Sequence, residues 1–130
     1  MTIRESGEMY LESIYVLSQK SSEVRGIDVG EYLGFSKPSV SRAIGLLKKD
    51  GLVITDGQGF IKLTEQGEER AKRIYERHLL LTELFINLGV SEATASEDAC
   101  RIEHYISDET FGAIKAHFKK YSAGNQNQQI

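Results

Sequence analysis

The sequence predicts a mainly α-helical protein with one small β-hairpin, organised as two domains. Apolar residues recur at the three- and four-residue spacing of helices along most of the 130 positions. One stretch, LVITDGQGFIKLT at 52–64, instead has apolar and β-branched residues on both sides of a glycine-rich turn. A chain of this length can bury one full core or two small ones.

The first predicted helix begins at Ser6, a residue type that caps helix N-termini, and carries Leu11 and Ile14 on one face. A polar segment, SSEVRG, separates it from a short helix, IDVGEYLG, that closes with glycine. A third helix is predicted from Pro38, which suits a first helical turn, to a stop at Gly51. Three helices followed by a hairpin is the order of a winged helix-turn-helix, which we place at residues 1–72.

The second half of the chain is predicted to be helical throughout. Thr64 is expected to cap a long fourth helix that becomes strongly apolar in its second half and closes at Gly89. Two further helices open at Ser91 and Ser107, so a helical domain is placed at residues 73–121. The segment SAGNQNQQI at 122–130 lacks apolar periodicity, and we expect a disordered tail there.

Charge is distributed unevenly along the chain. The total of −3 argues weakly against a nucleic-acid partner, but residues 36–63 carry a net charge of +3 while acidic residues dominate the last third. One cysteine excludes an intrachain disulfide, and the sequence has neither a secretion signal nor a run of about 20 apolar residues. We therefore expect a cytoplasmic protein that has no membrane partner and no organic cofactor.

The third helix is the candidate recognition helix. Residues near the N-terminus of such a helix read base edges in the major groove, and its flanking cations meet phosphates. The candidate DNA-contacting residues are Ser36, Lys37, Pro38, Ser39, Ser41, Arg42, Lys48 and Lys62. Each serine alone could equally be a helix cap, and a winged helix can also bind a protein. Together with the glycine-rich wing, these residues favour double-stranded DNA as the partner.

The segment CRIEH at 100–104 would place Cys100, Glu103 and His104 on one face of a helix. Such a triplet alone is more often a buried cysteine beside two solvated side chains. Similar donors occur on two other predicted helices, and the full set of candidates is Met9, Glu12, His78, Cys100, Glu103 and His104. Thiolate, thioether, imidazole and carboxylate donors together suit a divalent transition metal better than calcium or magnesium.

Four segments resemble the metal-dependent repressors of the diphtheria toxin repressor and manganese transport regulator type. They are EMYLESIY, SKPSVSRAIGLLKKDGLV, LTEQGEERAKRIYERH and EDACRIEHYISDE. The resemblance implies a homodimeric repressor that controls metal homeostasis and binds a palindromic operator when its metal is bound. It implies the short, two-domain form, without the SH3-like third domain of many iron-type members.

The resemblance also implies that all six candidate donors are metal ligands. Met9 and Cys100 match the iron-type members, whereas Glu12 and His78 match the manganese-type members, which have aspartate and glutamate in place of the two sulfur residues. Because soft donors shift preference away from manganese, we expect Fe²⁺, with Mn²⁺, Zn²⁺, Co²⁺ or Ni²⁺ as alternatives.

The match to the iron type is incomplete at a second site. Thr82 and Ser96 stand where iron-type members have ligands of an ancillary site. A second ion held in the manganese-type manner, by Glu12, Glu103 and His104, remains an alternative.

The dimer contact is expected on the apolar faces of the last two helices. The candidates are Ile106, Phe111, Ile114 and Phe118, although the same spacing fits an intramolecular core.

Three other functions fit parts of the sequence. Cys100 could be the thiol of a redox sensor built on the same fold. His78 and Cys100 could instead line the pocket of a regulator that binds a small ligand. A cysteine hydrolase would use Cys100 with a histidine base, but nothing in the sequence supplies an oxyanion hole, so we expect no enzyme.

Overall fold

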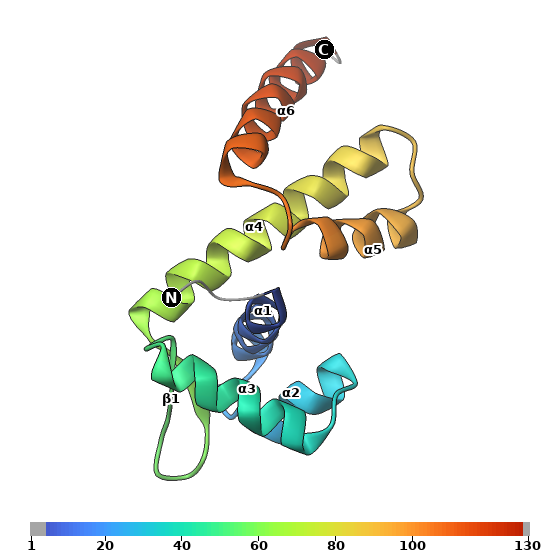
Figure 1. Cartoon of the computed structure of the whole chain (residues 1–130). Coiled ribbons are helices and arrows are strands. Elements are labelled where there is room, and N and C mark those ends of the chain that lie inside the picture. The colour runs from blue at the N-terminus through green and yellow to red at the C-terminus, as the bar shows by residue number, and fades with distance from the viewer. Residues whose placement is uncertain (1–4, 129–130) are drawn as a thin grey trace. The chain divides into compact units, whose positions relative to one another are not determined.

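The computed structural model describes the backbone of residues 5–128 and the side chains of residues 7–120 (Figure 1). Within this range it contains six helices and one two-stranded antiparallel hairpin, which confirms the predicted fold class. In chain order the elements are α1 Glu5–Lys20, α2 Gly26–Leu33, α3 Lys37–Lys49, β1 Val53–Thr55, β2 Ile61–Leu63, α4 Glu65–Asn87, α5 Glu92–Ile102 and α6 Asp108–Gln128.

The chain divides into two compact units, residues 1–75 and 76–130, and α4 runs through the division. The sequence places the boundary three residues earlier, after residue 72. A continuous helix gives no local signal for the point at which its contacts pass from one core to another, which explains the small difference. None of the described helices is both long enough and apolar enough to span a membrane.

The core of the first unit forms where α1, α2, α3 and the hairpin meet. Leu11, Ile14 and Val29 are completely buried there, and Val40 and Leu47 join them from the apolar stripe of α3. These are the positions that helical spacing predicts to face inward. This packing leaves the opposite side of α3 exposed.

The helix caps of the first unit follow the sequence closely at two places. Ser36 caps α3, because its side chain accepts a hydrogen bond from the Ser39 amide, and Pro38 lies in the first turn. Thr64 caps α4: its hydroxyl accepts from the Gly67 amide at 3.1 Å and donates to the Gly51 carbonyl at 2.7 Å. The hydrogen bond from Thr64 to the Gly51 carbonyl links the start of α4 to the turn that follows α3.

Three predicted boundaries are wrong. α1 begins at Glu5, so Ser6 lies inside the helix and does not precede it. α5 ends at Ile102, and residues 103–106 form a turn that closes with hydrogen bonds from the Tyr105 and Ile106 amides to the Ile102 carbonyl. α6 continues through residues 122–128, where a disordered tail is predicted.

The difference in the tail has a simple physical reason. Absence of apolar periodicity does not by itself exclude a helix, because a helix can continue where no proline interrupts it. Residues 129–130 of the predicted tail lie outside the described residues.

The core of the second unit is small. Leu81 of α4, Ala99 of α5 and Phe111 of α6 form its buried centre, and Ile106 packs against them. Phe111 is 8% exposed, so the structure assigns it to this core, and little of its surface remains for the dimer contact predicted for it. Ile114 and Phe118 are half-buried on α6 and remain candidates for that contact.

Candidate metal centre and DNA-binding surface

A carboxylate with an imidazole on each side lies inside the second unit. The Nδ1 atom of His78 is 3.0 Å from Oε2 of Glu103, and Nε2 of His104 is 3.2 Å from the other oxygen, Oε1. The side chain of Glu103 is completely buried, and that of His104 is 3% exposed. Three of the predicted donors therefore converge on one place, although His78 precedes the other two by 25 and 26 residues in the sequence.

The end of α5 explains how the sequence places these groups. Glu103 is the C-cap of α5, keeps helical backbone angles and donates its amide to the Ala99 carbonyl at 2.9 Å. His104 follows in the turn beyond the helix end. His78 faces this turn from α4, where it is half-buried. The predicted helix face is thus correct for Glu103, while His104 reaches the site from a turn.

The remaining three candidates lie on α5 and on α1. Cys100 lies in the last turn of α5 and is exposed, in contrast to the buried position that is usual for a free cysteine. Met9 and Glu12 lie one helical turn apart on α1 in the first unit, and both are half-buried. The structure of the second unit itself thus brings together His78, Glu103 and His104.

The three converging groups fit a divalent metal. Nitrogen and oxygen ligands bind such an ion at about 2.0–2.2 Å, so two ligands at right angles lie roughly 3 Å apart. The distances from Glu103 to the two imidazoles are of this size. Imidazole and carboxylate donors suit a transition metal, and a thiolate or thioether would add soft character.

The candidate DNA-binding residues all lie on α3, its cap and the hairpin. Arg42 is exposed on α3, and Lys62 is exposed on β2, where it pairs across the hairpin with Ile54. Three others, Lys37, Ser41 and Lys48, lie along one side of α3. The first unit therefore presents the predicted residues on elements that a winged helix-turn-helix uses to contact DNA.

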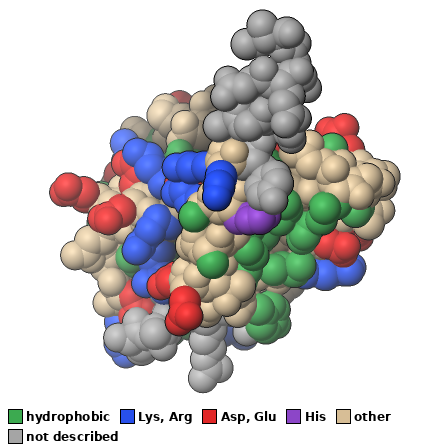
Figure 2. Space-filling model, turned by 90° about the horizontal axis from the view of Figure 1, so that it is seen from above, with side chains coloured by type: hydrophobic (Ala, Val, Ile, Leu, Met, Phe, Trp, Pro, Cys, Tyr) green, Lys and Arg blue, Asp and Glu red, His purple; other side chains and the backbone are tan. Residues whose placement is uncertain are grey.

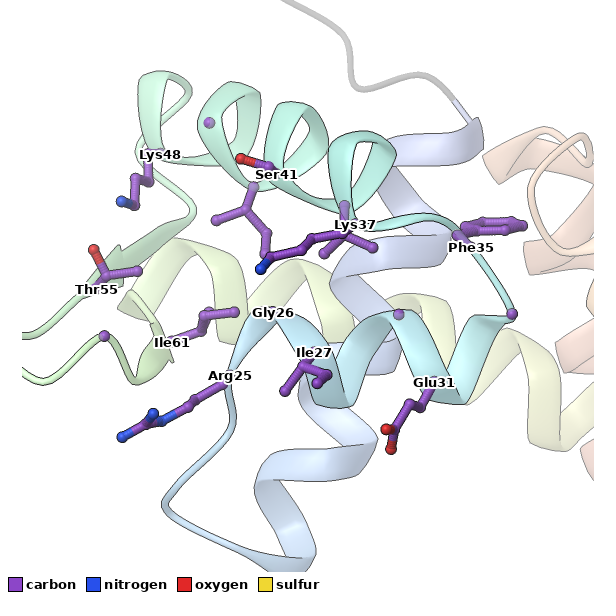
Figure 3. Close-up of a pocket in the computed structure, with 16 residues that line it drawn as sticks. Arg25, Gly26, Ile27, Glu31, Phe35, Lys37, Ser41, Lys48, Thr55 and Ile61 are labelled. Atoms are coloured by element: carbon purple, nitrogen blue, oxygen red, sulfur yellow. The ribbon is translucent and has the colours of Figure 1, made fainter.

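A hollow of about 820 Å³ lies between α2, α3 and the hairpin. Figure 3 shows Lys37, Ser41 and Lys48 along its α3 side, with Ile27 on the facing helix and Thr55 and Ile61 on the strands. Gly26, Gly30 and Gly45 are among the residues that line it. The hollow is thus a recess in the surface predicted to face DNA, with basic side chains around an apolar floor.

One basic residue of this surface was missed by the sequence reasoning. Arg25 precedes α2, lines the hollow and lies over the ring of Phe60, with its guanidinium carbon 4.7 Å from the ring centre. The available signal was the single cation in SSEVRG immediately before a helix N-terminus. Stacking on Phe60 holds Arg25 beside the wing, where a phosphate-binding cation would be useful.

The hydroxyl groups of the α3 cap are partly used within the protein. Ser36 donates to the Ser39 hydroxyl at 2.9 Å while it accepts from the Ser39 amide. Capping, the structural alternative for a single serine, therefore applies to Ser36. Arg42 also acts within the unit, because burial raises the pKa of the Tyr10 hydroxyl and the positive charge of Arg42 offsets part of that rise.

The wing is organised by one carboxylate. Oδ1 of Asp56 accepts hydrogen bonds from the amides of Gln58 at 2.9 Å and Phe60 at 3.0 Å. These bonds, led by the one from Phe60, lower the pKa of Asp56 below its usual value. The carboxylate thus fixes the turn that joins β1 to β2.

Comparisons with known proteins match the two parts of the chain to two family models. Residues 2–59 match the family described as "Iron dependent repressor, N-terminal DNA binding domain". Residues 64–130 match "Iron dependent repressor, metal binding and dimerisation domain". The two matches together account for nearly the whole chain.

Individual relatives are named as transcriptional regulators or repressors. The transcriptional regulator MntR of Escherichia coli O157:H7 is 33% identical over 120 residues, which cover 92% of this chain and 77% of that protein. The diphtheria toxin repressor of Corynebacterium diphtheriae is 30% identical over 106 residues, covering 81% of this chain and 47% of that protein. The solved structure of the manganese regulator SloR superposes with a TM-score of 0.78 at 28% identity, over 92% of this chain and 55% of that one. This chain therefore spans about half the length of two of these relatives.

Proposed function

The chain belongs to the iron-dependent repressor family of metal-dependent transcriptional repressors, and we propose that it is a homodimer that Fe²⁺ activates to control metal homeostasis. Members of this family are regulators and not enzymes. The observation that carries the proposal is the buried carboxylate of Glu103 between the imidazoles of His78 and His104. Such a group suits a bound cation, because a metal would neutralise the carboxylate and use both imidazole nitrogens as ligands.

We propose that Met9, Glu12 and Cys100 supply the remaining donors. Met9 and Glu12 belong to the first unit, which carries the DNA-binding surface, and the other four donors belong to the second. A metal that takes ligands from both units would favour one arrangement of the two. If operator DNA binds the same arrangement, metal and DNA each raise the affinity for the other by one factor, commonly about 5- to 150-fold.

The choice of Fe²⁺ depends on Met9 and Cys100. Their sulfur atoms are softer donors than the oxygen ligands that Mn²⁺ prefers. Similarity to the manganese regulator SloR favours Mn²⁺ as the second candidate for the physiological metal. Zn²⁺, Co²⁺ and Ni²⁺ are further candidates for the same donor set.

A homodimer bound to a palindromic operator is the second part of the proposal. Exposed apolar side chains supply surface for such a contact, and in the part of the second unit whose side chains are described the large ones are Leu79, Ile86, Leu88, Ile102 and Tyr105. Figure 2 shows apolar side chains gathered on one side of the face seen from above. Two recognition helices in one dimer would meet half-sites about 34 Å apart, one turn of DNA, and the repressor would act in the cytoplasm at the chromosome.

The test of the function uses DNA selected by the protein itself. Duplexes are selected from a random pool under anaerobic conditions with Fe²⁺ or Mn²⁺, and binding is then measured by fluorescence anisotropy. We expect a palindromic sequence whose binding is lost when a chelator removes the metal. Glu103→Gln should lose at least tenfold in metal-dependent affinity, because the neutral amide is a much weaker ligand.

The matched control is Glu109→Gln, which removes the same charge from an exposed position at the start of α6 and should bind as the wild type does. DNA binding that is unaffected by a chelator would contradict the metal-dependent function.

Exposure of Cys100 keeps one other function open, that of a thiol redox sensor on the same fold. That function predicts loss of DNA binding on addition of peroxide to metal-free protein, and its retention on addition of chelator. The same anisotropy assay distinguishes the two.

A further inference from the structure

The turn that carries Glu103 and His104 is held by a neighbouring arginine. One guanidinium nitrogen of Arg77 donates to the Ile106 carbonyl at 2.8 Å and to the Glu103 carbonyl at 3.3 Å. The second terminal nitrogen of the guanidinium binds the carboxylate of Asp108, the first residue of α6. The guanidinium also lies over the ring of Phe111, with its central carbon 5.2 Å from the ring centre.

These contacts satisfy groups that the backbone leaves open. The carbonyls of Glu103 and Ile106 lie beyond the last residue of α5, and the amides of Tyr105 and Ile106 bind the Ile102 carbonyl. Arg77 therefore supplies the hydrogen bonds for the carbonyl oxygens of Glu103 and Ile106. Its positive charge at the C-terminal end of α5 also opposes the negative end of the helix dipole.

Arg77 and His78 are consecutive residues of α4, and both act on this turn. Arg77 binds its backbone, and His78 meets the carboxylate of Glu103. Because consecutive helical residues point about 100° apart, the two side chains hold the turn from different directions. The position of the carboxylate relative to the imidazole of His78 is thereby set from one short segment of α4.

We propose that Arg77 is a positioning residue of the metal centre, which fixes the turn at 103–106 so that Glu103 and His104 face His78. This inference rests on the proposed function for the metal, while the clamp itself consists of contacts within the second unit. Groups that orient metal ligands commonly contribute a factor of about 10–100 in metal affinity. The planar guanidinium is suited to the task because it can bind several acceptors at fixed angles, which a lysine cannot do.

The first experiment measures the clamp without metal. Amide hydrogen exchange is followed in the metal-free full chain for the wild type, Arg77→Gln and Arg77→Lys. We expect faster exchange at Tyr105 and Ile106 in Arg77→Gln, because the turn that these amides close is no longer held. The lysine variant keeps the positive charge but lacks the planar guanidinium that binds several acceptors at fixed angles, so its exchange should be intermediate.

The second experiment measures the metal centre with Co²⁺ as the probe, by anaerobic titration and visible absorption. Arg77→Gln is expected to bind Co²⁺ about 10–100-fold more weakly, with a changed spectrum at saturation. The matched control is Arg101→Gln, on α5, because Arg101 is 72% exposed and pairs only loosely with Glu97 and Asp98 among the contacts described. This control should stay within twofold of the wild type.

The outcomes distinguish the positioning role of Arg77 from the proposed metal-binding function on which it rests. Wild-type affinity and an unchanged spectrum in Arg77→Gln would overturn the positioning role alone. Failure of the wild type to bind Co²⁺ would contradict the proposed metal function. Loss of the folded second unit in both Arg77 variants would assign Arg77 to stability and would also overturn the proposal.

Discussion

At the scale of single residues, Glu103 shows how a functional residue in a protein core differs from an ordinary apolar one. A buried carboxylate loses its hydration and requires compensating partners. The structure supplies two imidazoles at 3.0 and 3.2 Å, although an apolar side chain at this position would avoid the desolvation cost entirely. The second unit thus keeps an ionisable group at a place where stability alone would favour leucine, which is the expected signature of a ligand site.

Asp56 gives a pH-dependent prediction for the wing. Hydrogen bonds from the Phe60 and Gln58 amides lower its pKa below the usual 3.8. A depressed pKa means that the ionised carboxylate stabilises the folded wing. This contribution is complete above pH 3.8 and is lost as the pH falls through the lower, folded pKa.

NMR titration of the Asp56 carboxyl group and of the Gln58 and Phe60 amides measures this effect. All three should titrate together with a midpoint below 3.8, and the amide titration should disappear in Asp56→Asn. A midpoint at or above 3.8 would contradict the role assigned to these bonds.

At the scale of elements, the start of α4 depends on a glycine. Gly67 is buried in the first turn, and a Cβ atom added there would lie 1.9 Å from the carbonyl oxygen of Leu52. Gly67→Ala must therefore move α4 away from residues 51–52, where Thr64 also binds the Gly51 carbonyl. We expect the free energy of unfolding to fall by about 1–3 kcal/mol, the usual cost of overpacking, as measured by urea denaturation of the metal-free protein.

Gly45→Ala is the matched control for this prediction. Gly45 lies inside α3 with nothing within 4 Å of an added Cβ, so alanine should stabilise the helix by about 0.5–1 kcal/mol. Equal stability of the two variants would show that the contact with Leu52 relaxes at no cost.

The elements also show which parts of the fold a sequence can predict. Caps and turns that are encoded by one residue were predictable, as at Ser36, Thr64 and the hairpin around Asp56. The end of α5 at Ile102 was not, because Arg77 satisfies the carbonyls beyond it from another helix. Local patterns predict local hydrogen bonds, whereas an end that is held by a distant side chain requires the tertiary structure.

At the scale of the whole molecule, the candidate site also has one part that the sequence predicts and another part that requires the tertiary structure. The spacing in CRIEH predicted that Glu103 and His104 lie together, and His78, which was also a predicted donor, meets them in the structure. The exposed position of Cys100 was not predictable, because a free cysteine is buried in most proteins. Arg25 and Arg77 were missed for a common reason: each acts through contacts with backbone or ring atoms that no spacing pattern encodes.

Metal selectivity belongs to the whole molecule, because the two proposed sulfur ligands come from different units, Met9 from the first and Cys100 from the second. Replacing both by carboxylates, Met9→Asp with Cys100→Glu, would give the donor set of the manganese-type relatives and remove every soft ligand. We expect the ratio of the half-saturating Mn²⁺ and Fe²⁺ concentrations to fall by about tenfold, which corresponds to about 1.4 kcal/mol. Anaerobic titration of operator binding with Fe²⁺, Mn²⁺, Co²⁺ and Zn²⁺ measures this ratio. Glu109→Gln serves as the control, since it changes an exposed carboxylate outside the donor set and should leave the ratio unchanged. An unchanged ranking in the double variant would show that Met9 and Cys100 do not select the metal.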